Sequence, residues 1–155
     1  LVRNERQRQK WAEIRSVKLD MYPAWETDLQ RYHGLANWVI NCCITAISPE
    51  RPKAYIEDYA YAATGRVFHI AENMAILKDT LTKWGIKYEM IAPTVIKKYA
   101  TTKGNANKEK MYDAFTDETN RKLLDEFNIK LNNPITDIVD SYYIAKYGHA
   151  YGNNT

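Results

Sequence analysis

The chain has 155 residues, of which 45% are hydrophobic and 26% are charged, as is ordinary for a folded protein with a sizeable core. This composition excludes intrinsic disorder as the default state, and we expect one globular domain over residues 1–155. The formal net charge of +3 is too small to identify a partner, so any basic surface must come from local clusters of charge.

The first predicted elements are a strand and a long helix. The strand covers 12–22, where apolar and polar residues alternate imperfectly up to Pro23. The helix covers 28–47, and Asp28 is suited to its N-terminus. Apolar residues recur there at three- and four-residue steps, and the side expected to face the core holds Leu29, Tyr32, Ala36, Val39, Ile40, Cys43 and Ile47.

This helix contains the longest uncharged run of the chain and both cysteines. A polar stripe at helical spacing through 32–49 predicts a core helix rather than a membrane span, so no membrane partner is expected. Cys42 and Cys43 are adjacent, which would strain a disulfide and gives no metal-ligand spacing. A reduced, cytoplasmic protein is the simplest interpretation.

Two strands separated by a helix follow. Residues 53–59 predict a short buried strand whose apolar part ends at Glu57. A helix is predicted over 69–84, with Gly85 at its C-terminal end, and a further strand over 86–92. One face of that helix should hold Ile70, Met74, Leu77 and Leu81.

The last third of the chain is predicted to be mainly helical. Pro93 ends the preceding strand, and helices are predicted over 108–115 and 118–127. Pro134 opens the last helix, and the tail from Gly148 is expected to fray. The inward side of this helix should hold Ile135, Ile138, Val139, Tyr142 and Ala145. Strands that alternate with helices imply an α/β fold with a partly parallel sheet.

Three carboxylates are the candidate catalytic groups. Asp137 and Asp140 are three residues apart and so project from one side of the last helix, which could face Glu57 across a cleft. Clustered carboxylates can hold the two cations that hydrolyse a phosphodiester, and magnesium, or alternatively manganese, prefers such oxygen ligands. The lack of a Cys or His cluster argues against zinc. Most carboxylate pairs at this spacing lie on solvated helix faces, whereas an acid in a buried strand is rarer.

A lysine-rich segment, 97–110, lies between these acids. The only acid in it is Glu109, and its five lysines are Lys97, Lys98, Lys103, Lys108 and Lys110. One interpretation is a solvated loop and helix face. The other is a phosphate-binding surface, in which the loop 103–107 with Gly104 lets backbone amides approach a DNA strand.

In combination, these motifs resemble those of RuvC-type Holliday junction resolvases. The strand end Ile56-Glu57 resembles the family's second catalytic carboxylate position, and 93–98 followed by 103–108 resembles its basic segment. The run from Asp137 to Ser141 resembles the closing D-x-x-D-[AS] helix of the family. The resemblance covers roughly residues 12–147 and favours a phage or viral branch.

The resemblance implies a ribonuclease-H-like fold, with a mixed sheet flanked by helices, in a homodimer. The implied activity is magnesium-dependent paired nicking of four-way DNA junctions, in the host cytoplasm for a phage protein. By position, Glu57, Asp137 and Asp140 would be the catalytic metal ligands. The residues expected to contact branched DNA are Lys97, Lys98, Lys103, Lys108, Arg66, Tyr59 and Tyr61.

One departure from the family pattern follows the strand carboxylate. Family members often place an aromatic wedge just after it, whereas the third residue after Glu57 is Ala60. Tyr59 or Tyr61 would then either act as the wedge or pack in the core.

The larger departure is at the front of the chain, where the family has two strands and its first catalytic aspartate. Asp20 looks superficially suitable, but two strands cannot fit between it and the helix that starts near Asp28. We therefore interpret 12–22 as the third strand, with the first two upstream of Leu1. A parallel sheet tolerates no gap in its middle, so an upstream segment or a separate piece should complete it, and this chain alone should lack catalytic competence.

Two alternatives share the same residues. One is a nucleic-acid-binding module of the same fold that does not cleave, and the other is a ribonuclease-H-like enzyme that acts on a flapped or otherwise branched substrate. The remaining polar and aromatic groups are expected to be structural: isolated histidines at His33, His69 and His149, and core-filling tryptophans at Trp11, Trp25, Trp38 and Trp84.

Overall fold

The computed structural model of the protein describes residues 25–45, 52–59 and 67–152. Within these ranges the chain forms two compact units, which cover 25–93 and 94–152. The strand predicted over 12–22 lies outside the described residues. A single domain over 1–155 stays a prediction.

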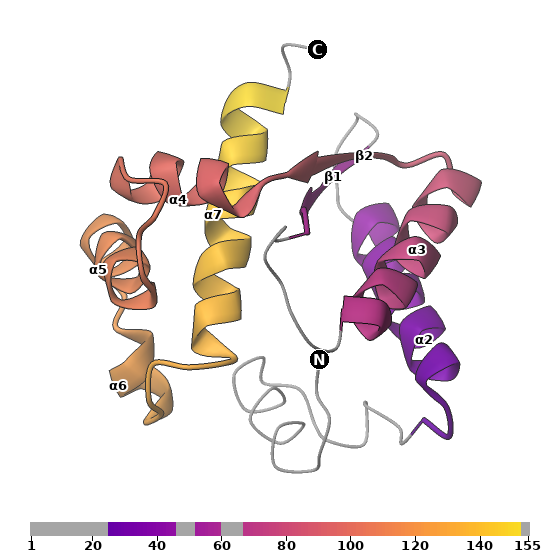
Figure 1. The fold of residues 1–155 in the computed structure, drawn as a ribbon, viewed down its shortest axis with the longest axis horizontal. Coiled ribbons are helices and arrows are strands. Elements are labelled where there is room, and N and C mark those ends of the chain that lie inside the picture. Colours follow the sequence, from indigo (N-terminus) through magenta and orange to yellow (C-terminus); the bar gives the residue numbers. More distant parts are fainter. Residues whose placement is uncertain (1–24, 46–51, 60–66, 153–155) are drawn as a thin grey trace. The chain divides into compact units, whose positions relative to one another are not determined.

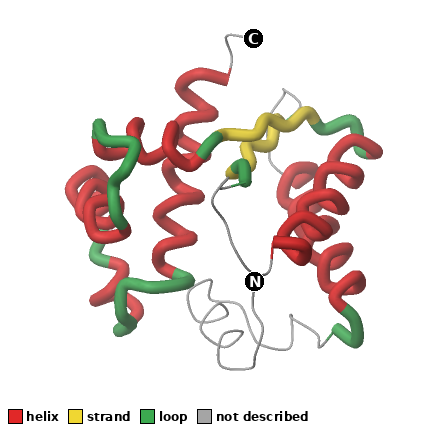
Figure 2. The backbone as a smooth tube through the Cα atoms, viewed as in Figure 1, coloured by secondary structure: helices red, strands yellow, loops and turns green. Residues whose placement is uncertain are grey.

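The unit 25–93 is a β-α-β arrangement preceded by a helix (Figure 1). Its elements are α2 (Asp28–Thr45), β1 (Lys53–Glu57), α3 (Val67–Lys83) and β2 (Lys87–Ile91). The two strands pair in parallel, from Lys53 opposite Lys87 to Glu57 opposite Ile91, and Figure 2 shows them side by side. Parallel strands need a crossover connection, which α3 provides. The predicted alternation of strands and helices is confirmed for this unit, as a two-stranded parallel sheet among helices.

The core of this unit lies where α2 and α3 pack together. One cluster of buried residues in it consists of Ile40, Leu81 and Ile86, and around them pack Val39, Cys43, Ala54, Ile56 and Leu77. The turn after α3 is closed as predicted, because Gly85 has a φ of 65° and Ile86 donates a backbone hydrogen bond of 2.9 Å to Leu81. Within the described ranges, no helix combines the length and the hydropathy that a bilayer-spanning segment needs.

Several apolar residues of this unit that were predicted to be buried are exposed. Leu29 and Ile70 lie in the first turns of their helices, where a helix has fewer neighbours than in its middle. Trp38 and Trp84 are 46% and 58% exposed, so the prediction that the tryptophans fill the core is wrong for these two. Trp25 does pack, because its indole lies so close to Gly34 that a Cβ there would come within 2.8 Å of it.

The unit 94–152 is helical (red through orange to yellow in Figure 1). It contains α4 (Pro93–Thr101), α5 (Lys108–Thr119), α6 (Leu123–Phe127) and α7 (Ile135–Tyr151), and α5 packs against α7. Its buried residues include Ile96, Ala106, Met111, Tyr112, Phe115, Leu123, Ile135, Thr136, Val139 and Tyr143.

Two helix boundaries differ from the sequence prediction. Pro93 not only ends the strand but also begins α4, a role that proline fills well because its missing N–H is not needed in the first turn. The helix predicted over 118–127 is broken, because Asn120 adopts a left-handed φ of 54° that ends α5. The short α6 then starts at Leu123, and Leu124 donates its backbone N–H to the Tyr112 hydroxyl at 3.0 Å.

The buried side of the last helix is shifted from the predicted one, because it includes Thr136 and Tyr143, and the helix extends further. Ile135, Val139 and Tyr143 are buried at four-residue steps, whereas Ala145 is exposed. Gly148 is buried inside α7, so the prediction that the tail frays from this residue is wrong.

Replacement of two adjacent tyrosines of α7 by phenylalanine is expected to have opposite effects on stability. The buried Tyr143 hydroxyl has no hydrogen-bond partner among the described residues, and burial raises the pKa of Tyr143 to about 12. Tyr142 instead donates to Glu118 Oε1 at 2.9 Å. We expect Tyr143→Phe to raise the free energy of unfolding by about 1 kcal/mol and Tyr142→Phe to lower it by about 0.5 kcal/mol. Chemical denaturation measures both, and a Tyr143→Phe protein less stable than the wild type would contradict this expectation.

Candidate functional site

Two half-buried carboxylates, Asp137 and Asp140, lie on one side of α7. Burial raises the pKa of both, and the neighbouring charge of Asp137 raises that of Asp140 further. Neither carboxylate forms a hydrogen bond or an ion pair with a described residue. A pair of desolvated, mutually repelling carboxylates is an arrangement that a bound cation would stabilise.

Two lysines from neighbouring helices oppose this repulsion. The charges of Lys97 in α4 and Lys108 in α5 lower the pKa of Asp140, and Lys108 also lowers that of Asp137. Asn107 caps α5 through a 3.0 Å hydrogen bond from Lys110 N–H to its side chain, which makes Lys108 the first residue of the helix. The structure therefore brings together two predicted carboxylates and two predicted DNA-binding lysines within one unit.

The loop between α4 and α5 is held by its own small residues. A Cβ on Gly104 would lie 3.2 Å from the Thr94 carbonyl oxygen, and Ala106 is buried. The Thr101 hydroxyl donates to the Lys97 carbonyl at 2.8 Å and accepts from the Lys103 N–H at 3.3 Å. These contacts give Gly104 a packing role. They also fix the backbone around two exposed lysines, Lys98 in the last turn of α4 and Lys103 in the loop. The phosphate contact expected of the loop amides stays a prediction.

Glu57, the third predicted ligand, lies at the carboxyl end of β1 in the other unit. It was predicted to interrupt a buried strand, but its side chain is exposed, because β1 is only partly buried along its length and ends at this residue. The next residue, Asp58, continues the pairing through a 2.8 Å hydrogen bond from its N–H to the Ile91 carbonyl. The convergence of Glu57 with Asp137 and Asp140 on one cleft stays a prediction.

Of the other predicted DNA contacts after β1, only Tyr59 is described. The Lys78 ammonium lies 5.8 Å from the centre of its ring, and its backbone N–H donates to Asp58 Oδ1 at 2.7 Å. Arg66 and Tyr61 lie outside the described residues. The half-buried Tyr59 thus packs against α3, and its role as a wedge stays a prediction.

Metal ligands beyond the aspartate pair are not assembled in the part of the chain that the structure describes. No group of three or more His, Cys, Asp or Glu residues there could hold a metal ion. The two aspartates fit a hard, oxygen-preferring cation such as Mg²⁺ in chemical type and burial, but they are only part of a ligand set.

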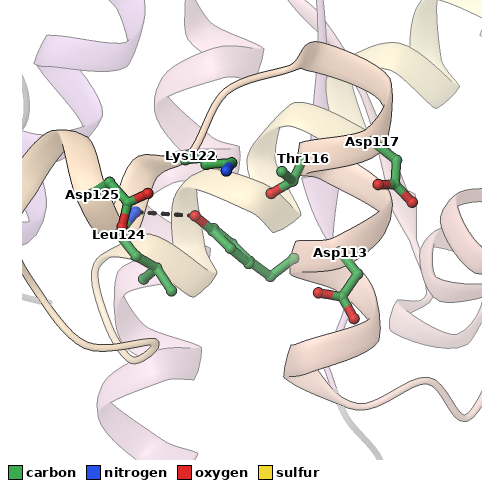
Figure 3. Close-up of a pocket in the computed structure, with 7 residues that line it drawn as sticks. Asp113, Thr116, Asp117, Lys122, Leu124 and Asp125 are labelled. Carbon is green, nitrogen blue, oxygen red and sulfur yellow. Dashed lines mark hydrogen bonds between the residues drawn. The ribbon is translucent and has the colours of Figure 1, made fainter.

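A hollow of about 400 Å³ lies on α5 and α6, apart from the predicted site residues (Figure 3). Tyr112 and Leu124 line it, and the backbone N–H of Leu124 donates to the Tyr112 hydroxyl, a hydrogen bond that is dashed in Figure 3. The other lining residues are Asp113, Thr116, Asp117, Lys122 and Asp125. Three carboxylates against one lysine would repel a phosphate backbone, so this hollow does not extend the lysine surface.

The sequence interpretation did not single out three tyrosines of this unit, Tyr99, Tyr147 and Tyr151. Their rings contact one another where α4 meets the C-terminal end of α7. A helical wheel of 135–151 could have found the last two, because they share a side with the aspartates.

Comparison with known proteins supports the fold. No protein-family model and no curated protein matches the chain. Among solved structures, that of Thermus thermophilus RuvC is similar, with a TM-score of 0.56 at 14% sequence identity, over 79% of this chain and 68% of that chain. At this level of identity the likeness shows a RuvC-like fold alone.

Proposed function

We propose that this protein is a structure-selective endonuclease that resolves four-way or other branched DNA junctions by metal-dependent hydrolysis of phosphodiesters. The observation that carries the proposal is the half-buried pair Asp137 and Asp140 beside Lys97 and Lys108. The RuvC-like fold agrees with the motif resemblance, from which the ribonuclease-H-like assignment, the homodimer and the phage or viral branch are also inferred.

In this proposal Asp137, Asp140 and Glu57 hold Mg²⁺, or alternatively Mn²⁺. A bound divalent cation would supply charge for the attacking and leaving oxygens of the phosphodiester. The residues of the chain contribute the rest. The two aspartates would bind the cation on one side of α7. Lys97 and Lys108 attract the DNA phosphates toward that side of the helix.

The DNA-binding surface of the proposal is the lysine set Lys97, Lys98, Lys103 and Lys108. Lysines contact the phosphate backbone without reading sequence, so selectivity for a branch must come from shape and from groups that contact unpaired bases. Arg66, Tyr59 and Tyr61 are proposed to contribute near the branch.

The decisive experiment is a cleavage assay of the full-length protein on a labelled four-way junction, with a linear duplex of the same sequence as the control. We expect nicks in the junction only, and only when Mg²⁺ or Mn²⁺ is added. Binding without any cleavage would instead support the alternative, a non-catalytic nucleic-acid-binding module of the same fold. Cleavage of flaps in preference to four-way junctions would keep the proposed nuclease activity but change its substrate to a flapped DNA.

A stability measurement tests the metal site without activity. Burial raises the folded-state pKa of Asp137 and Asp140, so the folded protein binds their protons more tightly than the unfolded chain does. The resulting stability is present at acid pH and is lost as the pH rises from about 4 through the raised pKa values. At pH 7, Asp140→Asn should therefore raise Tm, and Mg²⁺ should raise the Tm of the wild type but not of this variant. If the wild type and Asp140→Asn had the same Tm with and without Mg²⁺, Asp140 would neither destabilise the fold through its charge nor bind the metal.

A further inference from the structure

Tyr99, Tyr147 and Tyr151 form a group that we call the tyrosine cluster. The ring centroids of Tyr147 and Tyr151 are 4.8 Å apart. The ring centroid of Tyr99 lies 5.5 Å from that of Tyr147 and 5.9 Å from that of Tyr151. Tyr151 is 53% exposed, and the other two rings are partly exposed. Their hydroxyl groups make no hydrogen bond with a described residue. The cluster is thus an aromatic surface whose members pack mainly on one another.

The tyrosine cluster continues the side of α7 that carries the two aspartates. At 100° per residue, Asp137, Asp140, Tyr147 and Tyr151 fall within an arc of about 80°. With a rise of 1.5 Å per residue, Tyr147 lies about 10 Å and Tyr151 about 16 Å beyond Asp140 along the helix axis. A DNA strand that followed α7 away from the aspartates would meet both rings.

Positive charge accompanies the cluster. Lys97, which lowers the pKa of Asp140, precedes Tyr99 by two residues in α4. The Lys146 ammonium lies 6.0 Å from the centre of the Tyr99 ring and also pairs with Glu118. Aromatic rings interleaved with lysines are typical of surfaces that bind single-stranded nucleic acid, since the rings stack on bases and the lysines attract phosphates.

A purely structural role fits the cluster less well. The large buried side chains of α7, Ile135, Val139 and Tyr143, lie on a neighbouring side of the helix, whereas the buried residues at the edges of the cluster's own side are the small Thr136 and Gly148. Over half of the Tyr151 surface stays in contact with solvent. A tyrosine needed only to fill space would be buried more completely.

We infer that the tyrosine cluster is a stacking surface for unpaired bases close to the branch point of the DNA. This inference rests on the proposed function, because it names the part of a branched substrate that the same site holds. Every base has a π face, so the surface should tolerate any sequence while it distinguishes unpaired from paired bases. The tyrosine cluster would thereby add a preference for DNA with unpaired bases, which phosphate contacts by the lysines alone lack.

The test uses the full-length Asp140→Asn protein, so that no substrate is cut during binding measurements. The probes are a short thymidine oligonucleotide, a four-way junction and a linear duplex. Adding Tyr151→Ala is expected to weaken binding of the oligonucleotide by at least about fivefold, with no change on the duplex. The dependence of binding on salt should stay the same, because a stacked ring neutralises no phosphate.

Two variants separate stacking from folding, and one serves as a matched control. Tyr151→Phe keeps the aromatic face and should bind the oligonucleotide as the parent protein does. Tyr151→Leu keeps apolar volume without a π face and should bind it as weakly as Tyr151→Ala. Tyr88→Ala removes an exposed tyrosine from β2 in the other unit and should have no effect.

Loss of oligonucleotide binding in the Leu variant with retention in the Phe variant would support the stacking surface. Equal oligonucleotide binding by all these proteins, or an equal loss on duplex and oligonucleotide, would overturn it. The proposed function is judged separately by cleavage with Tyr151 intact. A protein that binds the oligonucleotide through Tyr151 but never cuts a junction would refute the nuclease and keep the stacking surface.

Discussion

Asp140→Asn is expected to abolish magnesium-dependent cleavage of a four-way junction while DNA binding stays intact or becomes tighter. The amide keeps the shape of the side chain but removes the charge that would hold the cation, so the cleavage rate should fall at least about a thousandfold. Removal of one of two adjacent negative charges also reduces repulsion of the phosphate backbone. Cleavage and gel-shift assays on the same labelled junction measure the two effects.

Asp113→Asn is the matched control for this experiment. Asp113 is an exposed aspartate of the same unit that lines the hollow on α5 rather than the carboxylate pair on α7. Its replacement removes the same charge and should leave the cleavage rate unchanged. If Asp140→Asn cut the junction at the wild-type rate, Asp140 would not belong to the catalytic set.

Replacement of Lys97, Lys98 and Lys108 by alanine should produce the second large effect, on DNA affinity. Each lysine that contacts a phosphate contributes about 0.9 to the slope of log K against log salt, so the triple variant should lose up to about 2.7 of that slope. At low salt the affinity for both junction and duplex should fall by about a hundredfold or more. Folding should change little, since Lys98 and Lys108 are exposed.

A second triple variant controls for the change in net charge. Lys83, Lys87 and Lys130 are exposed lysines outside the segment 97–110, and their replacement by alanine removes the same total charge. The slope of the control should stay close to that of the wild type. An unchanged slope after loss of Lys97, Lys98 and Lys108 would mean that these lysines form only a solvated face.

Much of the secondary structure followed from local sequence signals. The 3.6-residue pattern predicted α2 and α3, and Gly85 marked the end of α3, where its φ is 65°. Such signals are readable because a helix and its caps depend on residues within about one turn of each other. The spacing of Asp137 and Asp140 on one side of α7 is predictable for the same reason.

Other local signals had two meanings, and the sequence alone did not choose between them. Pro93 can end a strand or begin a helix, and here it does both. Asn120 is compatible with a helix interior but adopts a left-handed φ of 54° and separates α5 from α6. These choices depend on packing partners beyond the local segment.

The charges that could form a site were readable from the order of residues alone. They are the acids Glu57, Asp137 and Asp140 and the lysines of 97–110. Packing of the helices places Lys97 and Lys108, which belong to two separate helices, near enough to Asp140 to lower its pKa. The fold also leaves Glu57 exposed rather than buried. The reason is physical: burial and electrostatic environment depend on contacts between segments far apart in the chain, whereas periodicity reports only which residues share a face of one element.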